Sequence, residues 1–155
     1  MNVLIIDDYE SYGESLVELV QMLGHDAQYA PSFAEAEWLL DLLPFQVALL
    51  DFDMPAMTGP TIAANLVKRF PQIRPVIMSA RPPDAERRAA IRDWTFVQKP
   101  LSREVLQDLF NDIVRQKAGF GLLRRGFFPI LRVTTEKPEE GGRSQPDEGS
   151  PADEQ

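Results

Sequence analysis

Five short apolar runs recur along the first two thirds of the chain. They cover residues 3–6, 27–30, 47–50, 75–79 and 95–98. Most of them lack the alternation of apolar and polar positions that a half-exposed strand shows. Uninterrupted apolar runs of this length are typical of strands that are buried on both faces of a parallel sheet. The pattern therefore predicts five short parallel strands, of which the one at 27–30 has the weakest signal.

Between and after these runs, apolar side chains recur every three or four residues, which is the spacing of a helix with one buried face. The first such set is Tyr12, Leu16, Leu19, Val20 and Leu23. Ser32 and Glu35 form a capping box, Pro60 suits a first helical turn, and Asp84 and Ser102 are placed to cap two further helices. Strand and helix alternate five times, which predicts an α/β fold with a doubly wound parallel sheet covered by helices on both faces.

Composition limits the functions that this chain can have. Its 155 residues give room for one ordinary domain, and it has no cysteine, which excludes disulfides, thiol catalysis and Cys-based zinc sites. The net charge of −8 argues against a nucleic-acid-binding surface over the whole chain. Since no apolar run approaches the roughly 20 residues that a membrane span needs and the N-terminus turns acidic, we expect a cytoplasmic protein without a membrane span.

The last part of the chain differs from the rest. Residues 134–155 hold seven acidic and two basic residues and no aliphatic side chain larger than alanine. Such a segment buries too little surface to offset the entropy of ordering, so we predict a disordered acidic tail. Residues 119–133 are apolar and basic, and we interpret them as a flap that folds back on the domain or, alternatively, as a docking segment for a partner or membrane surface. The folded domain is expected over residues 1–118.

Polar residues follow the predicted strands at the points where these strands end. They are Asp7 and Asp8 after the first run, Asp51 and Asp53 after the third, Ser79 at the end of the fourth and Lys99 after the fifth. In an open parallel sheet, ligands bind beyond the carboxyl ends of the strands. The topology thus predicts that several carboxylates, a hydroxyl and a lysine converge on one edge of the sheet.

This set of side chains suits phosphoryl transfer. Crowded carboxylates raise each other's pKa unless a cation joins them, and oxygen ligands suit Mg²⁺. A carboxylate can act as a nucleophile and become an aspartyl phosphate, while Mg²⁺, a lysine and a hydroxyl stabilise the charge on the phosphoryl oxygens. Asp51 is the best nucleophile candidate because it ends a central strand. Taken singly, Asp51 and Asp53 could instead be turn formers, and Asp7 and Asp8 helix caps.

These residues are where the sequence resembles the response-regulator receiver family, of the CheY-like type. The matching pieces are Ile-Ile-Asp7-Asp8, Leu-Leu-Asp51-Phe-Asp-Met54-Pro55 with Gly59 after it, Val-Ile-Met-Ser79-Ala80 and Gln-Lys99-Pro100, and together they extend over about residues 1–116. The resemblance implies a flavodoxin-like (βα)5 fold. It also implies a phosphoacceptor in a two-component phosphorelay, rather than an enzyme acting on a separate substrate.

The resemblance further implies a role for each residue at the sheet edge. Asp51 would accept the phosphoryl group, and Mg²⁺ would be bound by Asp8, Asp51 and the backbone carbonyl of Asp53, with Asp7 reaching the metal through water. These roles make Mg²⁺ the expected cofactor.

The switch residues follow from the same resemblance. Lys99 would pair with the phosphoryl oxygens, and the Lys99–Pro100 peptide bond is expected to be cis. Ser79 would move to hydrogen-bond the phosphoryl group, and Phe96 would rotate inward behind it. Phe96 can equally be an ordinary core aromatic of the last strand.

Two features depart from the family pattern. The Gly-Ala pair that receivers usually carry before the fifth strand is missing, and the chain runs Ala-Ala-Ile91-Arg-Asp-Trp94-Thr instead. Arg81 lies two residues past Ser79, and we expect it to flank the pocket mouth opposite Asp53. If Arg81 and Asp53 pair there, they obstruct the hydrolytic water, so we expect a long-lived phosphorylated state that Arg81→Ala shortens.

Two other functions fit parts of the sequence. Asp51-Phe-Asp53 matches the D-x-D nucleophile motif of haloacid-dehalogenase-like phosphatases, although the order of the acidic residues fits those enzymes poorly. A receiver that binds its partner without phosphorylation is the other alternative. In the leading interpretation the chain is a stand-alone module whose partners are a sensor histidine kinase or phosphotransfer protein and a downstream protein target. His25 is expected to be a surface or half-buried strand residue rather than a phosphorelay histidine, and Trp38 is expected to pack beside the second helix's apolar stripe.

Overall fold

The computed structural model describes residues 1–119 of the chain. The predictions of a disordered tail over residues 134–155, and of a flap or docking segment that continues to residue 133, lie outside the described residues. The receiver-like fold expected over residues 1–118 lies within them.

Five strands form one parallel sheet, as the apolar runs predict. The strands are β1 (Asn2–Ile6), β2 (Asp26–Ala30), β3 (Val47–Asp51), β4 (Arg74–Ser79) and β5 (Thr95–Gln98). Their order in the sheet is β2-β1-β3-β4-β5, and every pair is parallel. The chain therefore runs outward from β1 to β2 and then returns to β3 on the other side of β1. From β3 it continues to β4 and β5, away from β1. The point where the direction reverses lies between β1 and β3, and it is there that sheets of this type bind ligands.

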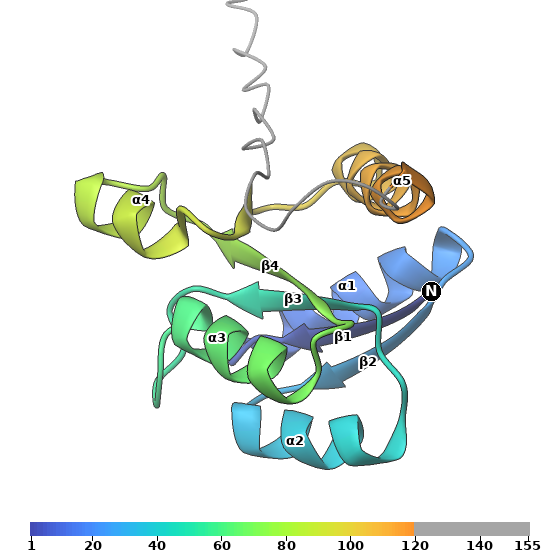
Figure 1. Ribbon diagram of the computed structural model, residues 1–155, viewed down its shortest axis with the longest axis horizontal. Helices are drawn as coiled ribbons and strands as arrows, with labels where there is room; N and C mark the ends of the chain where they lie inside the picture. Colours follow the sequence, from blue (N-terminus) through green and yellow to red (C-terminus); the bar gives the residue numbers. More distant parts are fainter. Residues whose placement is uncertain (120–155) are drawn as a thin grey trace, which may run out of the picture.

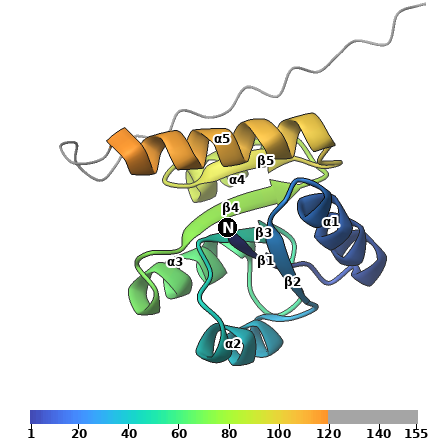
Figure 2. The same ribbon diagram turned by 90° about the vertical axis from the view of Figure 1, so that its right-hand side faces the viewer.

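Five helices connect and cover the strands. They are α1 (Glu10–Met22), α2 (Phe33–Leu42), α3 (Gly59–Arg69), α4 (Ala85–Ile91) and α5 (Arg103–Gly119). Buried residues of α1 and α5 pack on one face of the sheet, and buried residues of α2, α3 and α4 pack on the other (Figures 1 and 2). This is the doubly wound (βα)5 architecture that the sequence predicts.

Neighbouring residues of a strand point to opposite faces, so each strand supplies both halves of the core. In β1, Leu4 and Ile6 join the cluster under α2 and α3, whereas Val3 and Ile5 join the cluster under α1 and α5. All five residues of β3 are buried, and its last residue is Asp51. A central strand with both faces covered thus carries a carboxylate to its buried end.

Several predicted helix starts are confirmed. Ser32 caps α2 and accepts a hydrogen bond from the backbone N–H of Glu35, and Asp84 caps α4 by accepting from the N–H of Arg87. The hydroxyl of Ser102 accepts from the N–H of Val105 at the start of α5. Satisfying free N–H groups in this way fixes where each helix begins.

The expectation for Trp38 is wrong, because this residue of α2 is 66% exposed. The residues of α2 that are buried are Ala36 and Leu40, so the inward face is narrow and the indole lies beside it in solvent. His25 is half-buried, as expected: it directly precedes β2, with its ring edge-on to Phe110 and its Nδ1 3.3 Å from the N-terminal amine.

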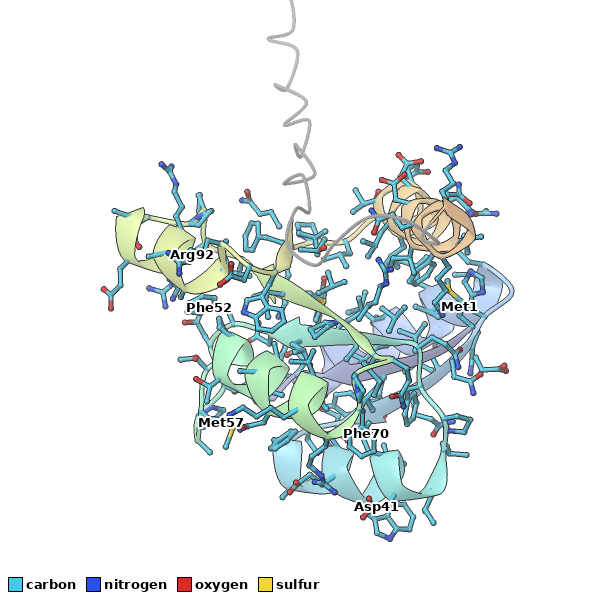
Figure 3. All side chains as sticks on the ribbon, in the orientation of Figure 1. Met1, Asp41, Phe52, Met57, Phe70 and Arg92 are labelled. Atoms are coloured by element: carbon cyan, nitrogen blue, oxygen red, sulfur yellow. The ribbon has the colours of Figure 1, made fainter. Side chains whose placement is uncertain are left out.

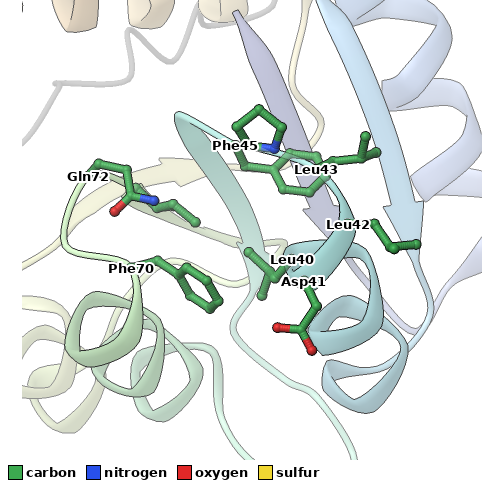
Figure 4. Close-up of a pocket in the computed structure, with 9 residues that line it drawn as sticks. Leu40, Asp41, Leu42, Leu43, Phe45, Phe70 and Gln72 are labelled. Carbon is green, nitrogen blue, oxygen red and sulfur yellow. The ribbon is translucent and has the colours of Figure 1, made fainter.

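A pocket of about 230 Å³ lies at the amino ends of β3 and β4 (Figure 4). It is lined by the last residues of α2 and by the segments that lead into the two strands, including Leu40, Phe45, Phe70 and Ile73. Figure 3 shows Phe70 and Phe52 well apart, with Phe52 close to α4. Because the candidate site follows the carboxyl ends of the strands, this pocket belongs to the opposite edge of the sheet.

None of the described helices is long and apolar enough to cross a membrane.

Gly59 allows the first turn of α3 to approach the end of β3, and we expect Gly59→Ala to disturb that approach. An added Cβ would lie closer to the backbone oxygen of Asp51 than real contacts allow, and 3.1 Å from the Cα of Phe52. Overpacking against rigid backbone costs about 1–3 kcal/mol. Urea denaturation should therefore show a lower free energy of unfolding for Gly59→Ala. A free energy equal to that of the wild type would show that the turn has room for a methyl group.

Candidate functional site

The residues predicted at the strand ends meet where the sheet reverses direction. Asp7 follows β1, Asp51 ends β3, Ser79 ends β4 and Lys99 follows β5. Asp7 and Asp51 therefore come from the two strands that flank the reversal point. Figure 1 shows the arrowhead of β4 directed toward α4, which lies beside this edge of the sheet.

Lys99 is the centre of the site. Its Nζ donates a 2.6 Å hydrogen bond to Oδ2 of Asp7 and another of 2.6 Å to Oδ1 of Asp51. The ammonium also lies 4.7 Å from the centre of the Tyr12 ring, and the side chain is only 14% exposed. Burial alone would lower the pKa of Lys99, but the hydrogen bonds to Asp51 and Asp7 outweigh burial and raise the pKa above its ordinary value. Lys99 is thus held as a cation between two carboxylates.

The backbone around Lys99 is fixed as well. The N–H of Lys99 donates to the carbonyl of Ser79 at 2.9 Å, and this bond continues the pairing of β4 with β5. The Lys99–Pro100 peptide bond is cis, as predicted.

Both carboxylates are buried, at 1% exposure for Asp7 and 6% for Asp51. Burial raises the pKa of Asp51 above its ordinary value, the Lys99 ammonium opposes this rise, and the charge of Asp7 adds to it. The second oxygen of Asp51 accepts a 2.9 Å bond from the N–H of Asp53, and Oδ1 of Asp7 accepts a 3.0 Å bond from the N–H of Tyr9. Turns that follow β1 and β3 therefore hold each carboxylate in place.

Arg87 from α4 is the residue of the site that the sequence interpretation missed. Its guanidinium donates to both carboxylate oxygens of Asp53, at 2.5 and 3.1 Å, and to Oγ of Ser79 at 3.2 Å. It also stacks over the ring of Phe52, with its Cζ 4.1 Å from the ring centre, and its side chain is only 14% exposed. The spacing carried a signal, because Arg87 lies four residues before the buried Ile91 and so shares its face of the helix.

The expected pair of Arg81 with Asp53 is present but weak. The guanidinium of Arg81 lies 3.7 Å from Oδ1 of Asp53, and its side chain is 72% exposed. The pKa of Asp53 is lowered first by the hydrogen bond from Arg87 and only to a lesser degree by the charge of Arg81. Arg87, rather than Arg81, is therefore the main partner of Asp53 at the pocket mouth.

Ser79 and Phe96 differ in how they relate to the pocket. Ser79 is fully buried, and its Oγ accepts hydrogen bonds from the N–H of Arg81 and from Arg87, both at 3.2 Å. A hydroxyl that accepts two bonds still has its own hydrogen to donate. Phe96 is 6% exposed and packs in the cluster under α2, α3 and α4. In this structure it is a core aromatic on the face that α4 covers.

The carboxylate oxygens at this edge of the sheet are suitable ligands for a hard cation such as Mg²⁺. Each ionised carboxylate offers about four lone-pair directions, and the hydrogen bonds described above leave part of that capacity free on Asp7 and Asp51. Asp8 is exposed beside Asp7 and lies outside the cluster around Lys99. Within residues 1–119, no three acidic or histidine side chains are grouped closely enough to hold a metal by themselves. The carboxylates of Asp7 and Asp51 suit an ion that keeps several waters and takes one or two carboxylates, which is how Mg²⁺ binds.

Comparison with known proteins gives the family. The model of the response regulator receiver domain matches residues 3–111. The sensor protein TorS of Escherichia coli K12 is 30% identical over 112 residues, which are 70% of this chain but only 12% of that protein. This chain thus spans a small part of that relative.

Solved receiver structures have the same fold. The CheY-like receiver of Methanospirillum hungatei JF-1 has a TM-score of 0.67 at 18% identity, covering 76% of this chain and 96% of that one. The response regulator TrrA of Thermotoga maritima, solved in complex with Mg²⁺ and BeF, has a TM-score of 0.63 at 20% identity, covering 72% of this chain and 97% of that one. With its strand order, its strand-end carboxylates and lysine, and a family match over most of its length, this chain belongs to the response-regulator receiver domain family.

Proposed function

We propose that this chain is a phosphoacceptor that takes a phosphoryl group on Asp51 and passes the signal on through protein contacts. The observation that carries this proposal is the double hydrogen bond of Lys99 to the buried carboxylates of Asp7 and Asp51. It supports a site in which one carboxylate is held beside a fixed cation, at the edge of the sheet where ligands bind. The family to which the chain belongs supports the same activity.

The proposed transfer forms one P–O bond and breaks one P–N bond. An oxygen of the Asp51 carboxylate attacks the phosphorus of a phosphohistidine on the donor protein, and a P–O bond forms. The P–N bond breaks, and its electron pair remains on the imidazole, which takes up a proton. Burial raises the pKa of Asp51, so the ionised carboxylate is more basic and a better nucleophile than an exposed one.

Lys99 and Ser79 are the residues that stabilise the product. The Lys99 ammonium is already 2.6 Å from Oδ1 of Asp51, so it lies beside the charge that the phosphoryl oxygens bring. The hydrogen of the Ser79 hydroxyl is free to be donated to one of these oxygens. We assign Lys99 to charge stabilisation and Ser79 to detection of the phosphoryl group.

Mg²⁺ is the proposed cofactor. Asp7, Asp8, Asp51 and the backbone carbonyl of Asp53 are the groups that would hold it, either directly or through water. When bound, the ion neutralises charge on the phosphoryl oxygens during transfer. The chain's own part is to keep the carboxylates ionised and oriented, which the Lys99 and backbone N–H bonds do.

The proposed donor is a sensor histidine kinase or a phosphotransfer protein in the cytoplasm, and the proposed output is a downstream protein. The relative TorS is itself named a sensor protein, which supports a place in two-component signalling. The described residues 1–118 are proposed to be the receiver unit.

Asp51→Asn should abolish phosphorylation and leave the fold intact, because the amide has nearly the same shape but is not nucleophilic. After incubation with acetyl phosphate and Mg²⁺, mass spectrometry should find the phosphoryl adduct on Asp51 of the wild type and of an Asp41→Asn control, which changes an exposed carboxylate of α2, but not in the variant. An adduct of wild-type abundance in Asp51→Asn would show that another residue is the acceptor. No adduct in any protein would favour a scaffold that works without phosphorylation, and rapid multiple turnover would favour a phosphatase.

The same variant should be at least as stable as the wild type at pH 7. Burial raises the pKa of Asp51 in the folded state, so ionisation of this group costs stability at every pH above that pKa. Below the pKa of the unfolded chain both states are protonated and the cost vanishes. The gain in free energy of unfolding should therefore shrink when pH falls, and a gain that grows on acidification would contradict the cause given.

Removal of Mg²⁺ by a chelator should stop labelling by acetyl phosphate, and Asp8→Asn should raise the Mg²⁺ concentration needed for half-maximal labelling. Asp8 is exposed and makes no ion pair among the described residues, so its replacement leaves the Lys99 cluster in place. Glu10→Gln, a nearby exposed carboxylate on α1, is the matched control. Equal Mg²⁺ dependence in the two variants would remove Asp8 from the metal site.

The lifetime of the phosphorylated state should depend on Asp53 more than on Arg81. Hydrolysis requires a water that attacks phosphorus in line with the P–O bond to Asp51, which then breaks to return the carboxylate and inorganic phosphate. Since Asp53 holds the closer Arg87 as well as Arg81, Asp53→Ala should speed decay more than Arg81→Ala. An exposed pair contributes only about 0.2–1 kcal/mol, which limits the effect of Arg81→Ala to roughly fivefold. Decay that is unchanged or slower in both variants would rule out a gate at the pocket mouth.

A further inference from the structure

Arg87 connects α4 to the phosphorylation site through its side chain. Its guanidinium contacts Asp53, in the loop after β3, and Ser79, at the end of β4. Its stacking on Phe52 covers one face of the planar group, and little of the side chain remains exposed. Arg87 is therefore held in one position between the helix and the two strand ends, rather than extended into solvent.

The apolar attachment of α4 is slight by comparison. Within Ala85–Ile91, Ile91 is the residue that is buried. Asp84 and Arg88 bond within the helix start and its preceding turn, because Asp84 accepts from the N–H of Arg87 and Arg88 donates to the carbonyl of Pro83. Among the described side-chain hydrogen bonds, those that join α4 to the strand-end loops come from Arg87. A change in the hydrogen-bond partners of Arg87 therefore affects a large share of the contacts that position α4.

A phosphoryl group on Asp51 would change the surroundings of Arg87. It brings a charge of about −1.5 to −2 and three strong acceptor oxygens. The proposed donor to one of these oxygens is the Ser79 hydroxyl, which is already 3.2 Å from the guanidinium. Arginine presents five N–H donors in a planar fork that matches phosphate oxygens, so Arg87 has donors for a phosphoryl oxygen and for Asp53 together.

The negative charge of Asp51 already acts on Arg87 in the unmodified protein. The hydrogen bond to Asp53 is the main reason that the pKa of Arg87 lies above its ordinary value, and the negative charges of Asp53, Asp84 and Asp51 add to the rise in that order. The guanidinium is therefore charged at every physiological pH.

We propose that Arg87 is a further phosphoryl-binding residue of this site and that it carries the phosphorylated state of Asp51 to α4. This rests on the proposed role of Asp51 as phosphoacceptor. When the phosphoryl group is present, the Nη1 that now bonds Ser79 bonds a phosphoryl oxygen, while Nη2 keeps Asp53. The guanidinium moves toward the phosphorus and draws α4 with it, so that the exposed face of this helix reports the state of the pocket to a protein partner.

The test compares α4 with and without beryllofluoride, a stable mimic of the phosphoryl group, in the presence of Mg²⁺. Hydrogen exchange is followed by mass spectrometry on peptides that span residues 84–94, in the full chain. The variants are Arg87→Gln, which removes the guanidinium, and Arg87→Lys, which keeps the charge without the fork. Arg88→Gln makes the same change of charge at the next residue, which is exposed and bonds to Pro83 instead of the site.

Trp94 provides a second measurement. It lies three residues past the end of α4 and directly before β5, its N–H donates to the carbonyl of Ile91 at 2.9 Å, and it packs against the core cluster under this helix. The chain has two tryptophans, and Trp38 is exposed, so Trp38→Phe leaves Trp94 as the single reporter without disturbing the core. Its fluorescence is then recorded as beryllofluoride is added.

We expect beryllofluoride to change exchange in α4 and Trp94 fluorescence in the wild type and in Arg88→Gln. Arg87→Gln should lose most of both changes, and Arg87→Lys should retain a part. Full changes in Arg87→Gln, or no change in a wild type that acetyl phosphate labels on Asp51, would overturn the role of Arg87 and leave the phosphoacceptor function standing. Absence of any Asp51 adduct in the wild type would overturn both.

Discussion

The ion pair of Lys99 with two buried carboxylates is the interaction on which the site depends. Two carboxylates at 1% and 6% exposure are costly to keep ionised, and a single ammonium at 2.6 Å from each offsets part of that cost. The lysine comes from the turn after β5, and the carboxylates come from β1 and β3. The sheet must therefore be complete, with β4 between β3 and β5, before the charges can meet.

The buried charges also explain why the surrounding turns are so fully hydrogen-bonded. Backbone N–H groups of Tyr9 and Asp53 donate to the two carboxylates, and the N–H of Lys99 is bonded to β4. Each bond removes a freedom that the chain would otherwise have at a strand end. The tight entry into α3 at Gly59 serves the same purpose, since it brings the helix onto the backbone of Asp51 itself.

A second charged group, Arg87 with Asp53, lies outside the cluster of Lys99, Asp7 and Asp51, at the mouth of the pocket. Arg87 spans Asp53 and Ser79 at the mouth of the pocket and belongs to a helix that has little apolar contact with the core. The inner cluster fixes the Asp51 carboxylate, whereas the outer contacts join the pocket to a helix with a single buried residue, Ile91. The proposed switch needs such a division between a tightly bonded inner site and a less tightly held outer helix, because a local change of charge must alter something that a partner can contact.

The sequence by itself determined the five strands, the five helices, the doubly wound order and the set of residues at the strand ends, because apolar periodicity and turn chemistry are local properties of the chain. It could not determine which arginine reaches Asp53: Arg81 and Arg87 are both near Ser79 in sequence, and only the packing of Ile91 turns the face of α4 that carries Arg87 inward. It likewise misplaced Trp38, because exposure depends on how wide a face of α2 the sheet covers. Tertiary contacts decide which of two neighbouring side chains reaches a site. The reason is that the choice depends on distances between segments, and the sequence does not contain these distances.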